Sequence, residues 1–189
     1  YKWNVDNSSL YGICLREYCE YISVYNTTIQ QNKYGIYLGG HSYYSYIFNT
    51  TIKNNDYGIY FEDSKIQDNW IESCIIKNSK YDGVFMGDNS GINYNVIIRS
   101  QISNNGRHGI NLQEYYDNCP NHNYIYHNLI YDNNNYQIYF DEYHCLANFI
   151  HNNTLNGKKY YHYYNDDNET LTDKAWDYNS KQKITNFVS

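Results

Sequence analysis

Acidic side chains recur at one position of a repeated phrase in the sequence. The phrase NNDYGIYFEDS, residues 54–64, returns with changes along the chain. Five residues after its glycine, or after the glutamine that once replaces it, stand Glu17, Gly40, Asp63, Asp88, Glu114 and Glu142. Carboxylates held one strand spacing apart, about 4.8 Å, repel each other unless they point into water, bind a cation or meet a basic partner. Two interpretations stay open: solvated turns, or a calcium-binding edge made by Asp63, Asp88 and Glu114, since calcium takes several oxygen ligands in irregular geometry.

The same three acids would be the acid and base of a glycoside hydrolase or polysaccharide lyase. Arg107, next to His108, is the best basic candidate for such a site. Other signals for catalysis are missing from the sequence: its 7 histidines show no HxH or HxxxH spacing, and there is no GxSxG, P-loop or CxxC motif. We therefore expect no cofactor other than calcium and leave an enzymatic activity open.

The phrases belong to a longer repeat, whose steps are marked by Gly12, Gly35, Gly58, Gly83, Gly109 and Gln137. Each unit contains three short segments in which apolar and polar residues alternate, which is the pattern of strands rather than helices. A unit this short cannot bury its own apolar side, but stacked copies share a continuous core. The repeat predicts an all-β fold, a single-stranded right-handed parallel β-helix of about six to seven coils. The repeat glycine should make a turn in each coil, and the residues one and three positions after it should face inward.

The units NTTIKNNDYGIYF and SQISNNGRHGINL resemble the parallel β-helix repeat of NosD-like and pectate-lyase-like surface proteins, over roughly residues 7–156. The resemblance implies a β-helix over residues 1–165. We expect an irregular cap or the start of a further segment at 166–189, with a short helix in TLTDKAWDYNSKQK. Proteins with this repeat include polysaccharide lyases and hydrolases, viral tailspikes, adhesins and non-catalytic sheath or surface-layer proteins, so the fold does not fix the function.

Aromatic residues should stack from coil to coil on the outside of this solenoid. Two outward columns are expected, one with Tyr34 and Tyr57 and the other with Tyr37, Tyr60, Phe85 and Tyr139. Such an aromatic surface stripe either stiffens the molecule or receives sugar rings or a neighbouring molecule. Asparagines should form a structural amide ladder at one corner, through Asn32, Asn55, Asn105 and Asn133.

The glycosylation sequons bear on the cellular compartment of the protein. The N-x-[ST] sequons begin at Asn7, Asn26, Asn49, Asn152 and Asn168. Three of them, Asn26, Asn49 and Asn152, hold the same outward place in their repeats, so we expect glycans if the source organism glycosylates.

Two disulfides are expected. Cys119 and Cys145 fall at nearly the same corner of consecutive coils, about 5 Å apart, which a disulfide can span. Cys14 and Cys19 straddle one turn and could close a small loop, whereas Cys74 should point inward as a free thiol. Five reduced thiols are the alternative. Bridges would indicate an extracellular protein.

The composition narrows the function further. A formal net charge of −6, with 14 Lys and Arg that form no stripe, argues against a nucleic-acid partner. No apolar run approaches the roughly 20 residues of a transmembrane helix. The leading hypothesis is a non-catalytic, glycosylated structural component of a cell surface, sheath or filament, or an adhesin. It would associate with itself or with neighbouring surface proteins, or with carbohydrate. The alternative is the lyase or hydrolase. Because the chain begins at Tyr1, we expect it to be a piece of a longer protein.

Overall fold

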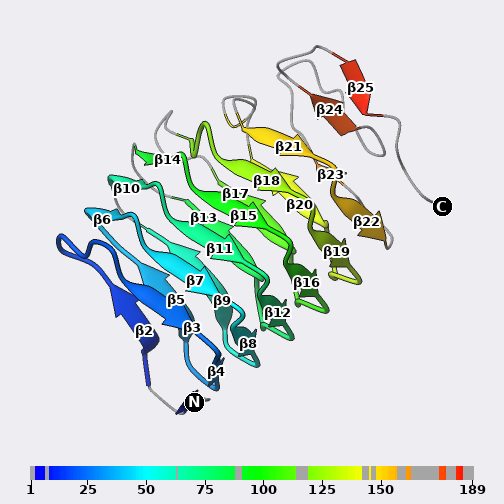
Figure 1. Cartoon of the computed structure of the whole chain (residues 1–189). Coiled ribbons are helices and arrows are strands. Elements are labelled where there is room, and N and C mark those ends of the chain that lie inside the picture. Colours follow the sequence, from blue (N-terminus) through cyan, green and yellow to red (C-terminus); the bar gives the residue numbers. More distant parts are fainter. Residues whose placement is uncertain are drawn as a thin grey trace.

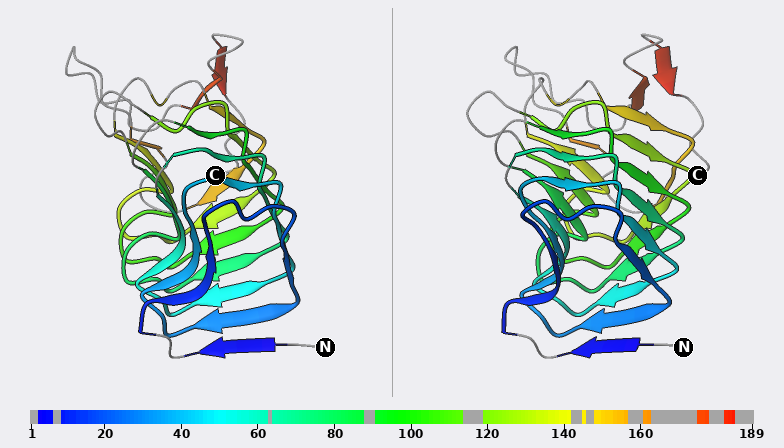
Figure 2. Two further views of the ribbon diagram at one scale, coloured as in Figure 1. Left: turned by 90° about the vertical axis from the view of Figure 1, so that its left-hand side faces the viewer. Right: turned by 60° about the vertical axis from the view of Figure 1, so that its left-hand side comes forward.

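The computed structural model describes residues 3–6, 9–62, 64–87, 91–113, 119–141, 145, 148–156, 161–162, 175–177 and 182–184. Their chain winds in similar turns, each stacked on the turn before it (Figure 1). Short strands of successive turns lie side by side and form flat parallel sheets around the winding axis (Figure 2).

Two of the sheets contain seven strands each. Sheet A consists of β1 (Trp3–Asp6), β4 (Thr27–Gln30), β8 (Thr51–Lys53), β12 (Ile75–Lys77), β16 (Gln101–Ser103), β19 (Leu129–Tyr131) and β22 (Thr154–Asn156). Sheet B consists of β2 (Tyr11–Leu15), β5 (Tyr34–Leu38), β9 (Tyr57–Phe61), β13 (Val84–Met86), β17 (Ile110–Leu112), β20 (Ile138–Phe140) and β23 (Tyr161–His162).

Two smaller sheets complete the turns. Sheet C consists of β6 (Ser42–Tyr43), β10 (Ile66–Gln67) and β14 (Ile92–Asn93). Sheet D consists of β3 (Ser23–Tyr25), β7 (Tyr46–Phe48), β11 (Trp70–Glu72), β15 (Val96–Ile98), β18 (Tyr124–Tyr126) and β21 (Phe149–His151). The predicted parallel β-helix is therefore confirmed, with sheet C as an addition to the three expected strands per turn.

The last described strands depart from this winding. β24 (Ala175–Asp177) and β25 (Gln182–Ile184) pair antiparallel with each other. They occupy the segment for which a short helix was expected, so that expectation was wrong. The expected boundary between residues 165 and 166 lies outside the described residues.

The core lies inside the winding. It consists of columns, each formed by the equivalent side chain of every turn. Equivalent residues pair in register from turn to turn, as Ile36 does with Ile59 and Ile71 with Ile97. These side chains are fully buried, at 0% exposure. Alternation within each short strand directs every second side chain inward. The inward columns predicted from the repeat are thus confirmed.

The repeat glycines are required by close packing. A Cβ atom on Gly58 would lie 2.3 Å from the carbonyl oxygen of Gly83 and 2.7 Å from Cγ2 of Ile76. Among the described glycines only Gly91 has a positive φ. The expectation that the repeat glycine makes a turn was wrong, because tight contact between turns is what excludes a side chain there.

Left-handed residues make the corners instead. Positive φ angles occur at the same place in successive turns, for example at Asn54, Asn78 and Asn104 with φ of 54°, 55° and 55°. Asparagine adopts this conformation more readily than most residues because its short polar side chain bonds locally. The chain can therefore change direction between sheets without glycine.

Buried polar side chains line the corner between sheets A and B and the corner between sheets C and D, and they bond from turn to turn. The predicted ladder between sheets A and B is confirmed: Asn32 Nδ2 donates to Asn55 Oδ1 at 3.1 Å, and Asn105 Nδ2 to Asn133 Oδ1 at 2.8 Å. A second ladder between sheets C and D was not predicted. We call it the Asn69 ladder, and it consists of Ser45, Asn69, Asn95, Asn123 and Asn148.

Candidate binding surfaces

The expected aromatic stripe forms on sheet B as one interleaved stack. Ring centroids of the two columns approach closely, with Tyr34 4.7 Å and Tyr57 4.8 Å from Tyr60. Tyr37 stacks on Tyr60 at 6.1 Å, and Tyr34 on Tyr57 at 5.7 Å. Burial raises the pKa of both Tyr57 and Tyr60, so these phenols stay protonated at neutral pH.

Part of this stripe is not at the surface. Tyr37 and Phe85 are each only 8% exposed. Their rings lie flat against glycines two residues further on, since a Cβ on Gly39 would be 2.7 Å from Tyr37 Cε1 and one on Gly87 would be 2.5 Å from Phe85 Cζ. The expectation of fully outward rings was wrong at these two positions, and Tyr34, Tyr57 and Tyr60 remain as the accessible part.

A charged cluster interrupts the stripe before Tyr139. Asp82 stands where other turns have tyrosine and is 0% exposed. Arg107 donates to it through Nε at 2.8 Å and through Nη2, and the backbone N–H of His108 donates at 3.0 Å. The side-chain hydrogen bonding to Asp82 raises the pKa of Arg107. The arginine considered for catalysis is thus engaged in neutralising a buried carboxylate, while Tyr139 stacks on His108 at 4.4 Å.

The acidic edge is described only in its first part. Asp63, Asp88 and Glu114, the residues of the calcium and acid–base hypotheses, lie outside the described residues, as does Glu142. Glu17 forms an exposed ion pair with Arg16 at 2.8 Å. Among the described residues no group of three or more His, Cys, Asp or Glu could hold a metal ion. The calcium site therefore stays a prediction.

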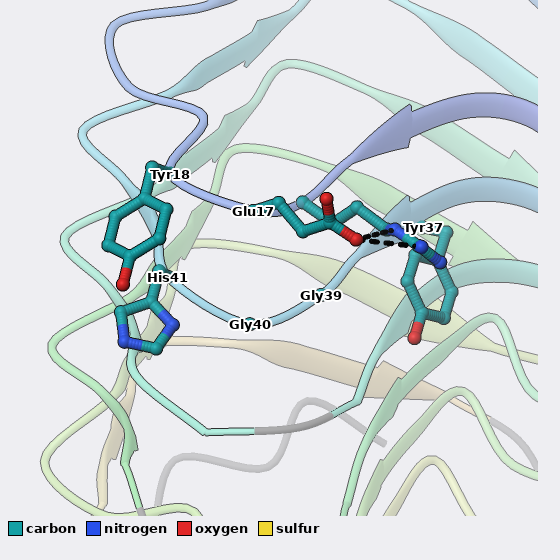
Figure 3. Close-up of a pocket in the computed structure, with 7 residues that line it drawn as sticks. Glu17, Tyr18, Tyr37, Gly39, Gly40 and His41 are labelled. Carbon is teal, nitrogen blue, oxygen red and sulfur yellow. Dashed lines mark hydrogen bonds and ion pairs between the residues drawn. The ribbon is translucent and has the colours of Figure 1, made fainter.

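A hollow of about 300 Å³ opens where the first two turns pass from sheet B to the next corner (Figure 3). Its lining combines the Arg16–Glu17 ion pair with aromatic side chains and glycine backbone, and consists of Arg16, Glu17, Tyr18, Tyr37, Gly39, Gly40 and His41. Tyr18 and His41 face each other with ring centroids 4.6 Å apart. Such a lining suits a small polar ligand with one flat face. The sequence reasoning missed this hollow because it aligned the residues as separate columns.

The central sequons share one corner between sheets D and A. Asn26, Asn49 and Asn152 have left-handed φ angles of 52°, 47° and 51°. Asn49 and Asn152 are exposed and Asn26 is partly exposed. Asn49 Nδ2 donates to Asn26 Oδ1 at 2.7 Å. Asn7 and Asn168 lie outside the described residues, and glycan occupancy stays a prediction for all five.

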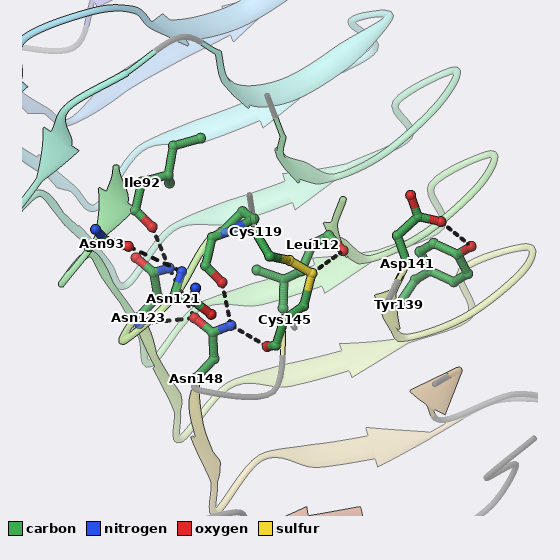
Figure 4. Close-up of a disulfide and its surroundings, with 11 residues drawn as sticks. Ile92, Asn93, Leu112, Cys119, Asn121, Asn123, Tyr139, Asp141, Cys145 and Asn148 are labelled. Atoms are coloured by element: carbon green, nitrogen blue, oxygen red, sulfur yellow. Dashed lines mark hydrogen bonds between the residues drawn. A yellow bond between two sulfur atoms is a disulfide. The ribbon is translucent and has the colours of Figure 1, made fainter. Parts of the chain in front are cut away.

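The cysteines divide into one bridge and three free thiols. Cys119 and Cys145 form a disulfide, with their Cα atoms 5.0 Å apart (Figure 4). Asn148, the last residue of the Asn69 ladder, donates to the carbonyl of Pro120 at 2.7 Å and so ties that ladder to the bridged segment. Cys14 and Cys19 are free, in contrast to the expected small loop. Two consecutive left-handed residues separate them, Glu17 and Tyr18, with φ of 59° and 67°.

Comparison with known proteins adds a family assignment for the winding. A family model described as "Right handed beta helix region" matches residues 2–112. No curated protein and no solved structure matches the chain. Within the described part of the chain, no helix has the length and apolar character needed to cross a membrane.

Proposed function

The chain belongs to the right-handed β-helix family, and from this premise we propose that it is a non-catalytic extracellular protein, a rigid and glycosylated structural component of a cell surface, sheath or filament, or an adhesin. The family alone leaves the function open, because the same winding carries enzymes, adhesins and structural proteins. The proposal therefore depends on what the side chains of this chain do.

The observation that carries it is the continuity of side-chain ladders along the winding axis. In the Asn69 ladder, Nδ2 of one turn donates to Oδ1 of the next at 3.0 Å, 3.1 Å and 3.0 Å for the steps Asn69 to Asn95, Asn95 to Asn123 and Asn123 to Asn148. Each step fixes the register of two neighbouring turns. A solenoid bonded in this way resists bending and shear, which are the properties that a structural rod needs.

The cysteine and sequon positions support an extracellular location. Disulfides persist in oxidising compartments and are rare in the cytosol. The sequons at Asn26, Asn49 and Asn152 lie on an outer corner, where a bulky glycan does not disturb the core. Neighbouring surface proteins, further copies of the chain and carbohydrate are the partners that the accessible aromatic side chains suit.

The test is made on cells that produce the chain naturally. Immunogold labelling should place it on the outside of the envelope, and intact-mass analysis of the extracted protein should show excess mass that glycosidase treatment removes. Replacing Asn26, Asn49 and Asn152 by glutamine should remove the part of that mass carried by the shared corner. Material that is cytoplasmic and has the bare polypeptide mass would refute the proposal.

A further inference from the structure

Sheet D presents an unusually apolar surface to the outside. In each of its six three-residue strands the middle side chain points into the core, so that two positions per strand, twelve in all, flank it on the outer side. Nine of these twelve are aromatic or aliphatic: Tyr25, Tyr46, Phe48, Trp70, Val96, Ile98, Tyr124, Tyr126 and Phe149. We call this set the sheet D face.

Sheet A provides a comparison within the same molecule. The corresponding flanking positions of β4, β8, β12, β16 and β19 number ten, and only Ile75, Leu129 and Tyr131 among them are apolar. Both sheets are parallel, and their strands have similar lengths, so the winding itself does not demand an apolar exterior. Parallel sheets in proteins usually have both faces covered. The composition of sheet D is that of a covered sheet.

Several of its side chains remain accessible in the single chain, although Val96 and Ile98 on β15 are only 6% and 3% exposed. Tyr25, Phe48 and Trp70 are 58%, 37% and 39% exposed. The corner that leads into sheet D adds Tyr21, Tyr44 and Tyr94, at 71%, 50% and 46%. With about 200 Å² for each whole aromatic side chain, these six expose roughly 600 Å². That is close to the roughly 800 Å² that each partner contributes to a standard stable interface, before the less exposed tyrosines are counted.

The large aromatic side chains of the sheet D face lie on both sides of its strand β15. Aromatic side chains lie on β7 and β11 toward one end and on β18 and β21 toward the other, with only Val96 and Ile98 on β15 between them. A twofold axis that lies between the two sheets, parallel to the strands and over β15, would therefore bring the aromatic strands of each copy onto the aromatic strands at the opposite end of its partner's sheet. Such an isologous contact is the commonest arrangement of soluble dimers.

We propose that the sheet D face is the interface between two copies of this chain, packed sheet on sheet about a twofold axis near β15. The inference rests on the proposed structural function and names the surface through which it assembles. Glu72 is compatible with this contact because Arg99 and Tyr46 both donate to it, and its side chain is only 13% exposed. Sheets that pack face to face lie about 10 Å apart, which leaves room for the ring layers.

The sequon corner is consistent with this arrangement. It borders sheet D and carries sequons in the turns of β3, β7 and β21, through Asn26, Asn49 and Asn152. In the three central turns the same corner position holds Ser73, Arg99 and His127 instead. The centre of the proposed interface is therefore free of glycan acceptors, and glycans would stand at its rim.

Sedimentation velocity of the full chain over a range of concentrations tests the proposal. The wild type should show a concentration-dependent dimer. Trp70→Glu should raise the dimer dissociation constant at least about 30-fold, the effect of losing one strong interface residue. The matched control is Leu129→Glu on sheet A, since Trp70 and Leu129 are 39% and 40% exposed. The control should dimerise like the wild type, with circular dichroism showing that both variants are folded.

A second pair of variants guards against local unfolding. Phe48 on sheet D and Ile75 on sheet A are 37% and 38% exposed. Phe48→Glu should weaken the dimer as Trp70→Glu does, whereas Ile75→Glu should dimerise like the wild type.

A wild type that stays monomeric at all concentrations, or equal weakening by sheet A and sheet D variants, would overturn the interface. Quenching of Trp70 fluorescence by a polysaccharide in a monomeric protein would also overturn the interface, and it would show that the sheet D face binds carbohydrate instead. A monomer that is still exported and glycosylated would leave the proposed function standing. A dimer found bare in the cytoplasm would uphold the interface and refute the function.

Discussion

Replacing Asn95 by alanine tests whether buried amides hold the turns together. Asn95 is 0% exposed. Its Nδ2 donates to the carbonyl oxygens of Ile66 and Asn93 at 2.8 Å and 3.2 Å, and to Asn123 Oδ1 at 3.1 Å. Its Oδ1 accepts hydrogen bonds from the backbone N–H and from Nδ2 of Asn69, at 3.1 Å and 3.0 Å. Alanine removes all of these bonds while leaving the strand pattern intact.

The expected loss follows from the groups that remain. The backbone N–H of Asn69 and the two carbonyl oxygens lose a partner in a site that water does not reach, and each such group costs about 1–3 kcal/mol. We therefore expect the free energy of unfolding to fall by at least about 3 kcal/mol, out of the roughly 5–15 kcal/mol typical of a domain.

Urea titration followed by near-ultraviolet circular dichroism measures this loss. The control is Asn134→Ala, because Asn134 is exposed and its side chain makes one bond, to the carbonyl of Gly106 at 3.2 Å. The control should change stability by no more than about 0.5 kcal/mol. If the two variants are equally stable, the amide ladder does not stabilise the winding and the reasoning is wrong.

Four further outcomes are expected. Gly58→Ala places a methyl group 2.3 Å from a carbonyl oxygen of the next turn, and should lower stability by about 3 kcal/mol or more in urea titration; an unchanged midpoint contradicts the close packing. Burial raises the pKa of Cys74 to about 11, so a thiol reagent in native buffer should modify the other two free cysteines and spare this one; equal labelling of all three contradicts its burial. Hydrogen bonds from an arginine and from Tyr46 lower the pKa of Glu72, so its stabilising contribution should be present above about pH 4.3 and lost as pH falls further. The same carboxylate raises the pKa of Tyr46 to about 12, so that tyrosine's contribution should be lost only as pH rises from about 10 toward that value. Melting temperatures of Glu72→Gln should lack both dependences, and a profile identical to that of the wild type counts against the pairing. Calcium should raise the melting temperature relative to a chelator if the acidic edge binds it, and identical melting in both buffers rules that site out.

The fold was predictable because its signals are periodic and local. Ile52, Ile76 and Ile102 recur at one place in each unit and alternate with polar neighbours, which fixes both the strands and the inward side of each strand. Stacking in register then turns each sequence column into a physical column. The amide ladder between sheets A and B followed from the same alignment.

The features that comparing the repeat units did not predict depend on contacts between columns. The Asn69 ladder has a regular sequence signal, since Asn69, Asn95 and Asn123 each stand two residues before a buried isoleucine, but their burial follows from the corner closing around them. The burial of Tyr37 and Phe85 requires a glycine two residues later to leave room for the ring. The apolar exterior of sheet D could have been found by comparing its outward columns with those of sheet A.

The buried amide ladders also give the molecule an electrical direction. Ladder amides donate through Nδ2 to a backbone carbonyl of the preceding turn, as Asn95 does to Ile66. Between the amides themselves, Nδ2 donates only to Oδ1 of the turn with higher residue numbers, as from Asn69 to Asn95 and from Asn32 to Asn55. Backbone dipoles of a sheet nearly cancel, whereas these side-chain dipoles all point the same way along the axis. The amide-to-amide dipoles of the ladders therefore add along the axis, with their positive ends toward the C-terminal turns. End-to-end stacking with one polarity is favoured by this dipole, and two copies related by a twofold axis across sheet D would cancel each other's field.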